Sequence, residues 1–147
     1  MKTLKILSLM LLLVVATTAC NNKKGGNKAE GPVGEWHLIS WNEEAPEFDV
    51  YISFGADKSF TIYQQVWSLD FECFEGSYSI DGDVISGKYA DGSKWACDYN
   101  FAVAEKNLTL KSKESQPVTS VYEKCTIPAE IISEATSTRS SEVVPFL

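Results

Sequence analysis

The sequence predicts an all-β domain, an eight-stranded antiparallel up-and-down barrel that ends in a short helical turn. Three observations predict it. Apolar and polar residues alternate from Val33 onward, turn-forming residues interrupt this alternation at short intervals, and no window before Pro128 has a convincing helical period. An open meander of this length would expose two sheet edges, so we expect the first strand to pair with the last.

The first nineteen residues are expected to be a lipoprotein signal peptide. Lys2 and Lys5 precede an apolar stretch over residues 6–16, and small residues follow as far as Cys20. A basic start, an apolar core of about 7–15 residues and small residues before a cut are typical of secretory signals. The cysteine after Ala19 resembles the lipobox of bacterial lipoproteins, which implies attachment of lipid, palmitate included, to Cys20. An ordinary signal peptide with an incidental cysteine is the alternative.

Residues 20–32 are expected to form a flexible tether. The segment after Cys20 has one alanine and otherwise polar or turn-forming residues, so it cannot bury enough apolar surface to fold. Twelve residues of this type have an r.m.s. reach of roughly 20 Å. Signal and tether together predict a protein of the bacterial cell envelope, anchored by lipid, with the outer membrane as the expected location.

The barrel is expected over residues 33–135. Its strands are expected at 34–41, 48–54, around 60–62, 71–80, 84–90, 95–103, around 108–110 and 118–125. Glycine, aspartate or asparagine marks the turns near residues 55–58, 81–83, 91–93 and 106–107. Pro128 suits the first position of a helical turn over 129–135. Residues 136–147 are expected to be a loose tail, although 143–147 are apolar enough to dock.

Register arithmetic tests whether the aromatic residues share one face. If Ile80 opposes Asp83, Tyr78 faces Ile85. If Ala90 opposes Lys94 across a three-residue turn, Tyr99 also faces Ile85 and Trp95 faces Tyr89. The aromatic faces of three successive strands then agree.

Alternation places many large side chains inside the barrel. The inward set is Trp36, Leu38, Val50, Ile52, Phe54, Phe60, Ile62, Phe74, Tyr78, Ile85, Tyr89, Trp95, Tyr99, Phe101, Leu108 and Leu110. Buried tyrosine hydroxyls need partners, which a ligand can supply. The candidate ligand-binding residues are therefore Tyr78, Tyr89, Trp95, Tyr99, Phe101 and Phe74. The alternative is a barrel that its own side chains fill completely.

Several local patterns resemble the lipocalin-like lipoproteins of bacteria. They are Gly34-x-Trp36 at the first strand, Ile52-x-Phe54-x-x-Asp57-x-x-Phe60 across a hairpin, and Tyr122-Glu123-Lys124 before a proline-led turn. The resemblance covers roughly residues 32–135. It implies that Trp36 plugs the closed end of the barrel beneath a basic residue, for which Lys124 is the candidate. It also implies binding of a small apolar molecule without catalysis.

The reactive side chains argue against an enzyme, a metal site and a cofactor. The chain has one histidine and one arginine, which argues against catalytic triads, histidine-rich metal sites and arginine clamps. His37 alternates with Trp36 and is expected at the surface, against the alternative of a haem ligand. A net charge of −7 disfavours nucleic acid.

Three cysteines remain once Cys20 is lipidated. The registers separate Cys73 and Cys97 by roughly 14 Å, whereas a disulfide needs Cα atoms within about 7 Å. We expect three free thiols, with a disulfide between Cys97 and Cys125 as the alternative.

The sequence therefore predicts a monomeric, membrane-anchored protein that binds a small apolar ligand in or at the barrel mouth. The alternative is an interaction or inhibitor module of the envelope, with a filled core and an acidic rim that blocks a basic enzyme. An internal cavity lined by Tyr78, Tyr89 and Tyr99 would favour the ligand. A packed core with Trp41 or Trp67 exposed would favour the protein partner.

Overall fold

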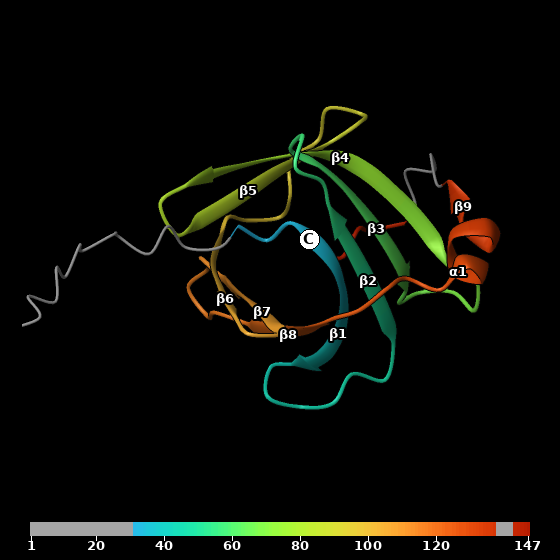
Figure 1. Cartoon of the computed structure of the whole chain (residues 1–147), viewed down its shortest axis with the longest axis horizontal. Coiled ribbons are helices and arrows are strands. Elements are labelled where there is room, and N and C mark those ends of the chain that lie inside the picture. Colours follow the sequence, from blue (N-terminus) through green and yellow to red (C-terminus); the bar gives the residue numbers. More distant parts are fainter. Residues whose placement is uncertain (1–30, 138–142) are drawn as a thin grey trace, which may run out of the picture.

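The computed structural model describes residues 31–137 and 143–147, and these form one closed barrel (Figure 1). Cys20 and the predicted signal and most of the tether lie outside the described residues. The strands are β1 Gly34–Trp41, β2 Asp49–Phe54, β3 Ser59–Gln65, β4 Glu72–Asp81, β5 Val84–Tyr89, β6 Tyr99–Ala104, β7 Asn107–Ser112, β8 Thr119–Lys124 and the short β9 Thr136–Ser137, with the helix α1 Ala129–Glu134 before β9.

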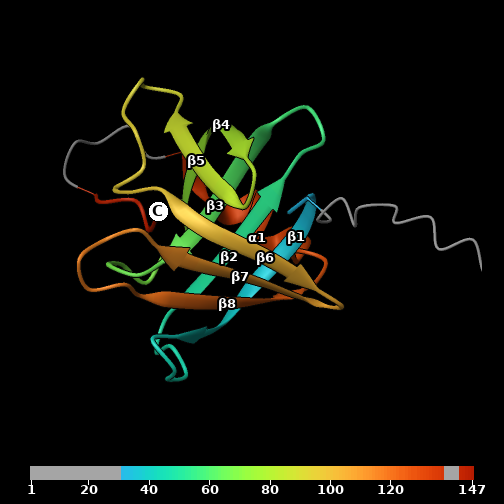
Figure 2. The ribbon, with the colours of Figure 1, turned by 90° about the vertical axis from the view of Figure 1, so that its left-hand side faces the viewer.

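The barrel closes through the predicted pairing of its first strand with its eighth. Successive strands pair antiparallel, β1 pairs with β8, and a further pairing joins β3 to β4. Turned by 90°, Figure 2 shows β6, β7 and β8 side by side as one wall of the barrel. The prediction of an eight-stranded antiparallel barrel with a short C-terminal helix is confirmed.

The alternating pattern places the predicted side chains in the core. All residues of the predicted inward set are buried except Phe74, which is partly buried against the others. The prediction missed Tyr122 and Leu147, which belong to the same cluster. It also missed the polar residues Gln64 and Glu72, which are buried.

The turn between β4 and β5 corrects the predicted register. Asp81 pairs with Val84, so Tyr78 opposes Gly87 rather than Ile85. The turn has two residues, as predicted, but lies one position later, at Gly82 and Asp83; Gly82 begins it with a φ of 62°, the left-handed conformation that a tight hairpin requires. A slip of two residues leaves every side chain on its predicted face.

The wall between β5 and β6 is paired for two residues and then opens. Tyr99 opposes Ile85 as predicted, but β6 begins at Tyr99 and not at Trp95. The Trp95 amide donates to the carbonyl of Gly87 at 3.1 Å, so Trp95 does not face Tyr89. The indole ring lies over Gly87 so closely that a Cβ atom there would collide with it.

Trp36, the predicted plug, is buried at one end of the barrel. Its side chain is 1% exposed, and its indole N–H donates to the carbonyl of Pro32 at 2.7 Å. The Nζ atom of Lys124 lies 6.0 Å from the centre of the ring. Lys124 therefore occupies the position over the tryptophan that the resemblance implies.

The C-terminal residues are ordered wherever the structure describes them. Pro128 caps α1 from outside the helix instead of occupying its first position. Residues 136 and 137 pair in parallel with β4, and Leu147 is buried in the core. The prediction of a loose tail is wrong for residues 136 and 137, which pair with β4. The burial of Leu147 agrees with the expectation that residues 143–147 can dock.

The structure also describes three of the cysteines and the histidine. Cys73, Cys97 and Cys125 are free, as expected. His37 is partly buried, stacks on Tyr51 and pairs with Asp49 at 2.9 Å. In the described part of the chain, no helix has the length and apolarity needed to cross a membrane.

Candidate functional site at the barrel mouth

The end of the barrel opposite Trp36 holds the last described segment, residues 143–147. Figure 1 shows the C-terminal end inside the ring of strands. We call this segment the tail and define the mouth site as the tail together with the five residues that hold it. These residues are Trp41, Phe48, Gln64, Trp67 and Tyr89.

Gln64 binds the backbone of the tail with both atoms of its side-chain amide. It lies on the inward face of β3 and is 0% exposed. Its Nε2 atom donates to the carbonyl of Val144 at 3.1 Å, and its Oε1 atom accepts from the amide of Phe146 at 2.8 Å. The same Nε2 atom lies 3.4 Å from a carboxylate oxygen of Glu72. A buried amide needs such partners, because an unpaired one loses its hydrogen bonds to water.

Aromatic side chains at the rim hold the tail from outside. The ring of Phe146 lies 5.7 Å from that of Phe48 and 6.5 Å from that of Trp41, measured between centroids. The indole N–H of Trp67 donates to the carbonyl of Val144 at 3.2 Å. Trp41 is nevertheless 42% exposed and Trp67 70% exposed, so the rim keeps a partly uncovered aromatic surface.

Leu147 is the part of the tail that enters the lumen. It is 2% exposed, and its carbonyl accepts a hydrogen bond from the Tyr89 hydroxyl at 2.6 Å. Burial raises the pKa of Tyr89 well above its usual value, so this hydroxyl remains a donor at neutral pH. The tail thus places an aliphatic side chain and a hydrogen-bond acceptor in the lumen.

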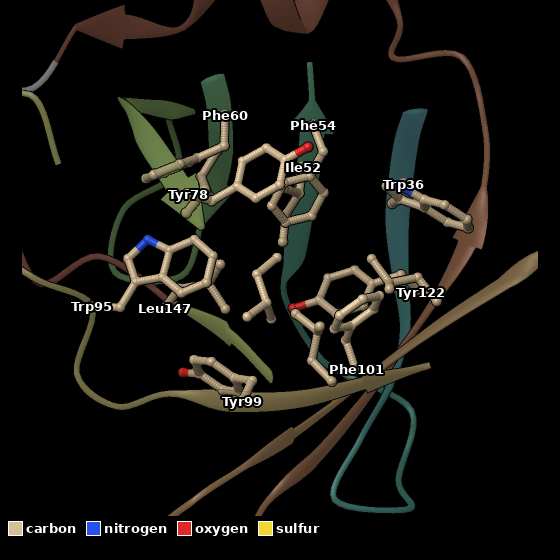
Figure 3. Close-up of a cluster of buried hydrophobic side chains, with 14 of the residues drawn as sticks. Trp36, Ile52, Phe54, Phe60, Tyr78, Trp95, Tyr99, Phe101, Tyr122 and Leu147 are labelled. Atoms are coloured by element: carbon tan, nitrogen blue, oxygen red, sulfur yellow. The ribbon is translucent and has the colours of Figure 1, made fainter. Parts of the chain in front are cut away.

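The predicted ligand-binding residues belong to the same buried cluster as Leu147, and Figure 3 shows Trp95 beside Leu147. The ring of Trp95 lies 5.2 Å from that of Phe60, 5.9 Å from that of Tyr99 and 6.5 Å from that of Phe54. Tyr89 contacts Phe60 and Phe74, and Tyr78 contacts Phe54. Phe101 is buried in the same cluster. The structure brings the six predicted residues together, with Phe74 at the margin.

Two buried polar atoms of the lumen lack a hydrogen-bond partner among the described residues. They are the indole Nε1 of Trp95 and the hydroxyl of Tyr122. Figure 3 shows the Tyr122 hydroxyl pointing toward the middle of the cluster. Burial raises the pKa of Tyr122, and the polar side chain of Ser120, close to the hydroxyl but outside hydrogen-bonding geometry, lowers it by less. By contrast, Tyr78 donates to the carbonyl of Gly55 at 2.8 Å.

Two open depressions lie in the barrel wall. One, of about 640 Å³, is lined by parts of β3, β4 and β5 and includes Tyr89. The other, of about 610 Å³, lies where β5 and β6 separate and includes Trp95. Neither is lined by Tyr78 or Tyr99. Within the residues that the structure describes, no group of three metal-binding side chains occurs.

The sequence contained a signal for part of what the prediction missed. Gln64 follows Phe60 and Ile62 at the spacing of two that points side chains inward. A glutamine at that position was a sign of a buried polar contact. The partner of Gln64 lies 80 residues along the chain at Val144, which local patterns cannot reveal.

Comparisons with known proteins identify one matching family model and several similar solved structures. Residues 33–110 match the family model described as the lipocalin-like domain. A solved lipocalin-like protein from Bacteroides uniformis is 20% identical, and the match covers 63% of this chain and 97% of that chain with a TM-score of 0.49. An uncharacterized protein from Bacteroides eggerthii is 18% identical, with 63% and 98% covered and a TM-score of 0.49. No curated protein matches the chain.

Proposed function

This chain belongs to the lipocalin-like domain family, and from that premise we propose that it binds a small, largely apolar ligand at the mouth of its barrel. Lipocalin-like domains are generally binding folds without enzymatic activity. We further propose that the protein is a monomer held by lipid on Cys20 in the bacterial cell envelope, at the outer membrane.

The observation that carries the proposal is the pair of unpartnered polar atoms in the lumen. Native cores pair nearly all buried polar groups, so a lumen built only for packing would leave neither Trp95 Nε1 nor the Tyr122 hydroxyl alone. A ligand with a hydrogen-bond acceptor provides the missing partner. The seat of Leu147 indicates the rest of the ligand, which is aliphatic and replaces that side chain.

The test is native mass spectrometry of the protein purified from its own host, followed by titration with dodecanoate as a probe. We expect a copurified small molecule and saturable binding of dodecanoate. Tyr122→Phe removes only the hydroxyl and should weaken binding about fivefold, the net value of one hydrogen bond. The matched control is Tyr63→Phe, on the outer side of β3. A chain that copurifies with no small molecule and does not bind dodecanoate would contradict the proposal.

The anchor is tested separately. Cys20→Ser removes the thiol that would carry the lipid, so the variant should move from the membrane fraction to the soluble fraction of lysed cells. Cys125→Ser is the matched control and should stay with the membrane. Retention of the Cys20→Ser variant in the membrane fraction would refute the anchor.

A second candidate, a protein-interaction module, is favoured by the rim. Trp41 and Trp67 are exposed around a lumen that the tail already fills. Exposed aromatic groups of this kind are enriched in protein interfaces. Glu43, Glu44 and Glu47 lie exposed in the loop after Trp41, so a basic or neutral partner would suit this rim.

A further inference from the structure

We propose that the mouth site is a peptide-recognition site, built to take an extended apolar segment of a partner protein. The tail occupies that site in the free protein. The inference shares the mouth with the proposed function but concerns a different class of ligand. It therefore stands or falls on its own experiment.

The first argument is that the mouth recognises a peptide backbone. Gln64 provides a donor to one carbonyl and an acceptor to the amide two residues later, and Trp67 donates to the same carbonyl. Tyr89 donates to a further carbonyl deeper in the lumen. A hydrocarbon chain has none of these groups and would leave the buried amide of Gln64 with only its 3.4 Å contact to Glu72. Hydrogen bonds to main-chain atoms are the usual source of affinity when a protein binds an extended peptide.

The second argument is that the site selects two side chains and leaves others free. Phe146 packs on Trp41 and Phe48, and Leu147 is buried among the lumen aromatics. Val144 is 65% exposed although its carbonyl accepts two hydrogen bonds. The site therefore specifies an aromatic residue followed by an aliphatic one and tolerates variation before them.

The third argument concerns the charge of the partner. The exposed carboxylates of Glu43, Glu44 and Glu47 lie in the loop between Trp41 and Phe48, the two rings that hold Phe146. Like charges next to an incoming segment would oppose its binding. The expected partner segment is thus apolar, with neutral or basic residues beside it.

The experiment supplies the segment in trans to a full chain whose own tail is weakened. Phe146→Asp with Leu147→Asp places two charges in apolar seats and should expel the tail. The probe is the synthetic peptide Val-Val-Pro-Phe-Leu, measured by calorimetry and by its effect on the melting temperature. We expect saturable binding and a raised melting temperature. The unmodified chain should bind more weakly, because its own tail competes at an effective concentration on the order of millimolar.

Two controls distinguish specific recognition of the peptide from non-specific hydrophobic binding. The peptide Val-Val-Pro-Asp-Asp should not bind. Gln64→Leu in the same background removes both backbone contacts at similar size and should weaken binding of the peptide by about 25-fold, as the loss of two hydrogen bonds of about fivefold each would. If the double aspartate variant does not fold, Phe146→Ala with Leu147→Ala provides the milder test.

The outcomes separate the two proposals. Binding of dodecanoate without binding of the peptide overturns the peptide site and leaves the small-ligand function standing. Binding of the peptide without dodecanoate supports the peptide site and counts against the small-ligand function. A dimer of the unmodified chain that the peptide dissociates would show a tail exchanged between copies, and would overturn the assignment to a partner protein.

Discussion

Trp36 combines burial with a satisfied polar group at one end of the barrel. Its ring is enclosed on the inside by the core and is covered by the stem and charge of Lys124. Its N–H is paired with the carbonyl of Pro32, so burial leaves no polar atom unsatisfied. The residue therefore contributes packing, a hydrogen bond and a cation–π contact at once.

Replacing Trp36 by alanine should destabilise the protein strongly. The loss of a large buried aromatic side chain typically lowers the free energy of unfolding by about 3–5 kcal/mol. Trp36→Phe keeps much of the packing but loses the hydrogen bond, so its loss should be smaller. Urea unfolding measures both variants. An unchanged melting temperature for Trp36→Ala would show that the residue does not close the barrel.

Single residues also mark the limit of sequence reasoning at this scale. Trp36 and Lys124 could be paired because a resemblance supplied their relation, and the aromatic cluster followed from alternation. The contact of Gln64 with the tail could not be predicted. Its partner Val144 lies 80 residues further along the sequence, and only the folded chain brings the two residues together. The site was therefore predictable in its lumen and not at its mouth.

The strand β5 shows how an element accommodates a large ring. Gly87 lies beneath the indole of Trp95, where β6 has separated from β5. Because Gly87 has no Cβ atom, the indole ring of Trp95 can approach the backbone of β5 closely. Gly76 on β4 similarly makes room for the ring of Phe60.

Gly87→Ala should displace Trp95 from the wall. The added methyl group would overlap the indole ring, and overpacking of this kind usually costs about 1–3 kcal/mol. Tryptophan emission should shift to longer wavelength as the ring gains contact with water. Ser86→Ala, at the neighbouring position of β5, is the matched control and should leave the emission unchanged. Unaltered emission in Gly87→Ala would contradict the packing described here.

The elements also show why boundaries were predicted less well than faces. The β4–β5 register was wrong by two residues because the two-residue turn lies at Gly82 and Asp83, one position later than predicted. The side-chain faces survived because two is the period of a strand. The start of β6 was wrong because Trp95 keeps the inward alternation in a segment that joins β5 only through the Trp95–Gly87 hydrogen bond and an isolated bridge at Lys94. The alternation of apolar and polar residues indicates which side chains are buried. It does not indicate where the backbone is hydrogen-bonded to a neighbouring strand.

At the scale of the whole molecule, closure encloses tyrosines that cannot ionise without reaching water. Burial raises the pKa values of Tyr89, Tyr99 and Tyr122 far above the ordinary value of 10.0. In the unfolded chain these groups titrate normally. Above about pH 10 the unfolded state therefore binds fewer protons than the folded state, so stability must fall as pH rises.

The expected result is steep alkaline unfolding. Each of the three tyrosines contributes a slope of about 1.4 kcal/mol per pH unit, hence about 4 kcal/mol per unit together, once the pH exceeds the unfolded pKa. Below about pH 10 both states are protonated at these residues, so the same groups cause no loss of stability there. Urea unfolding at successive pH values measures the slope, and Tyr99→Phe should reduce it by about one third. If the native barrel instead formed all of its tyrosinate near pH 10 and stayed folded, the hydroxyls of the lumen would have to reach solvent. The enclosed barrel on which both proposed sites depend would then be ruled out.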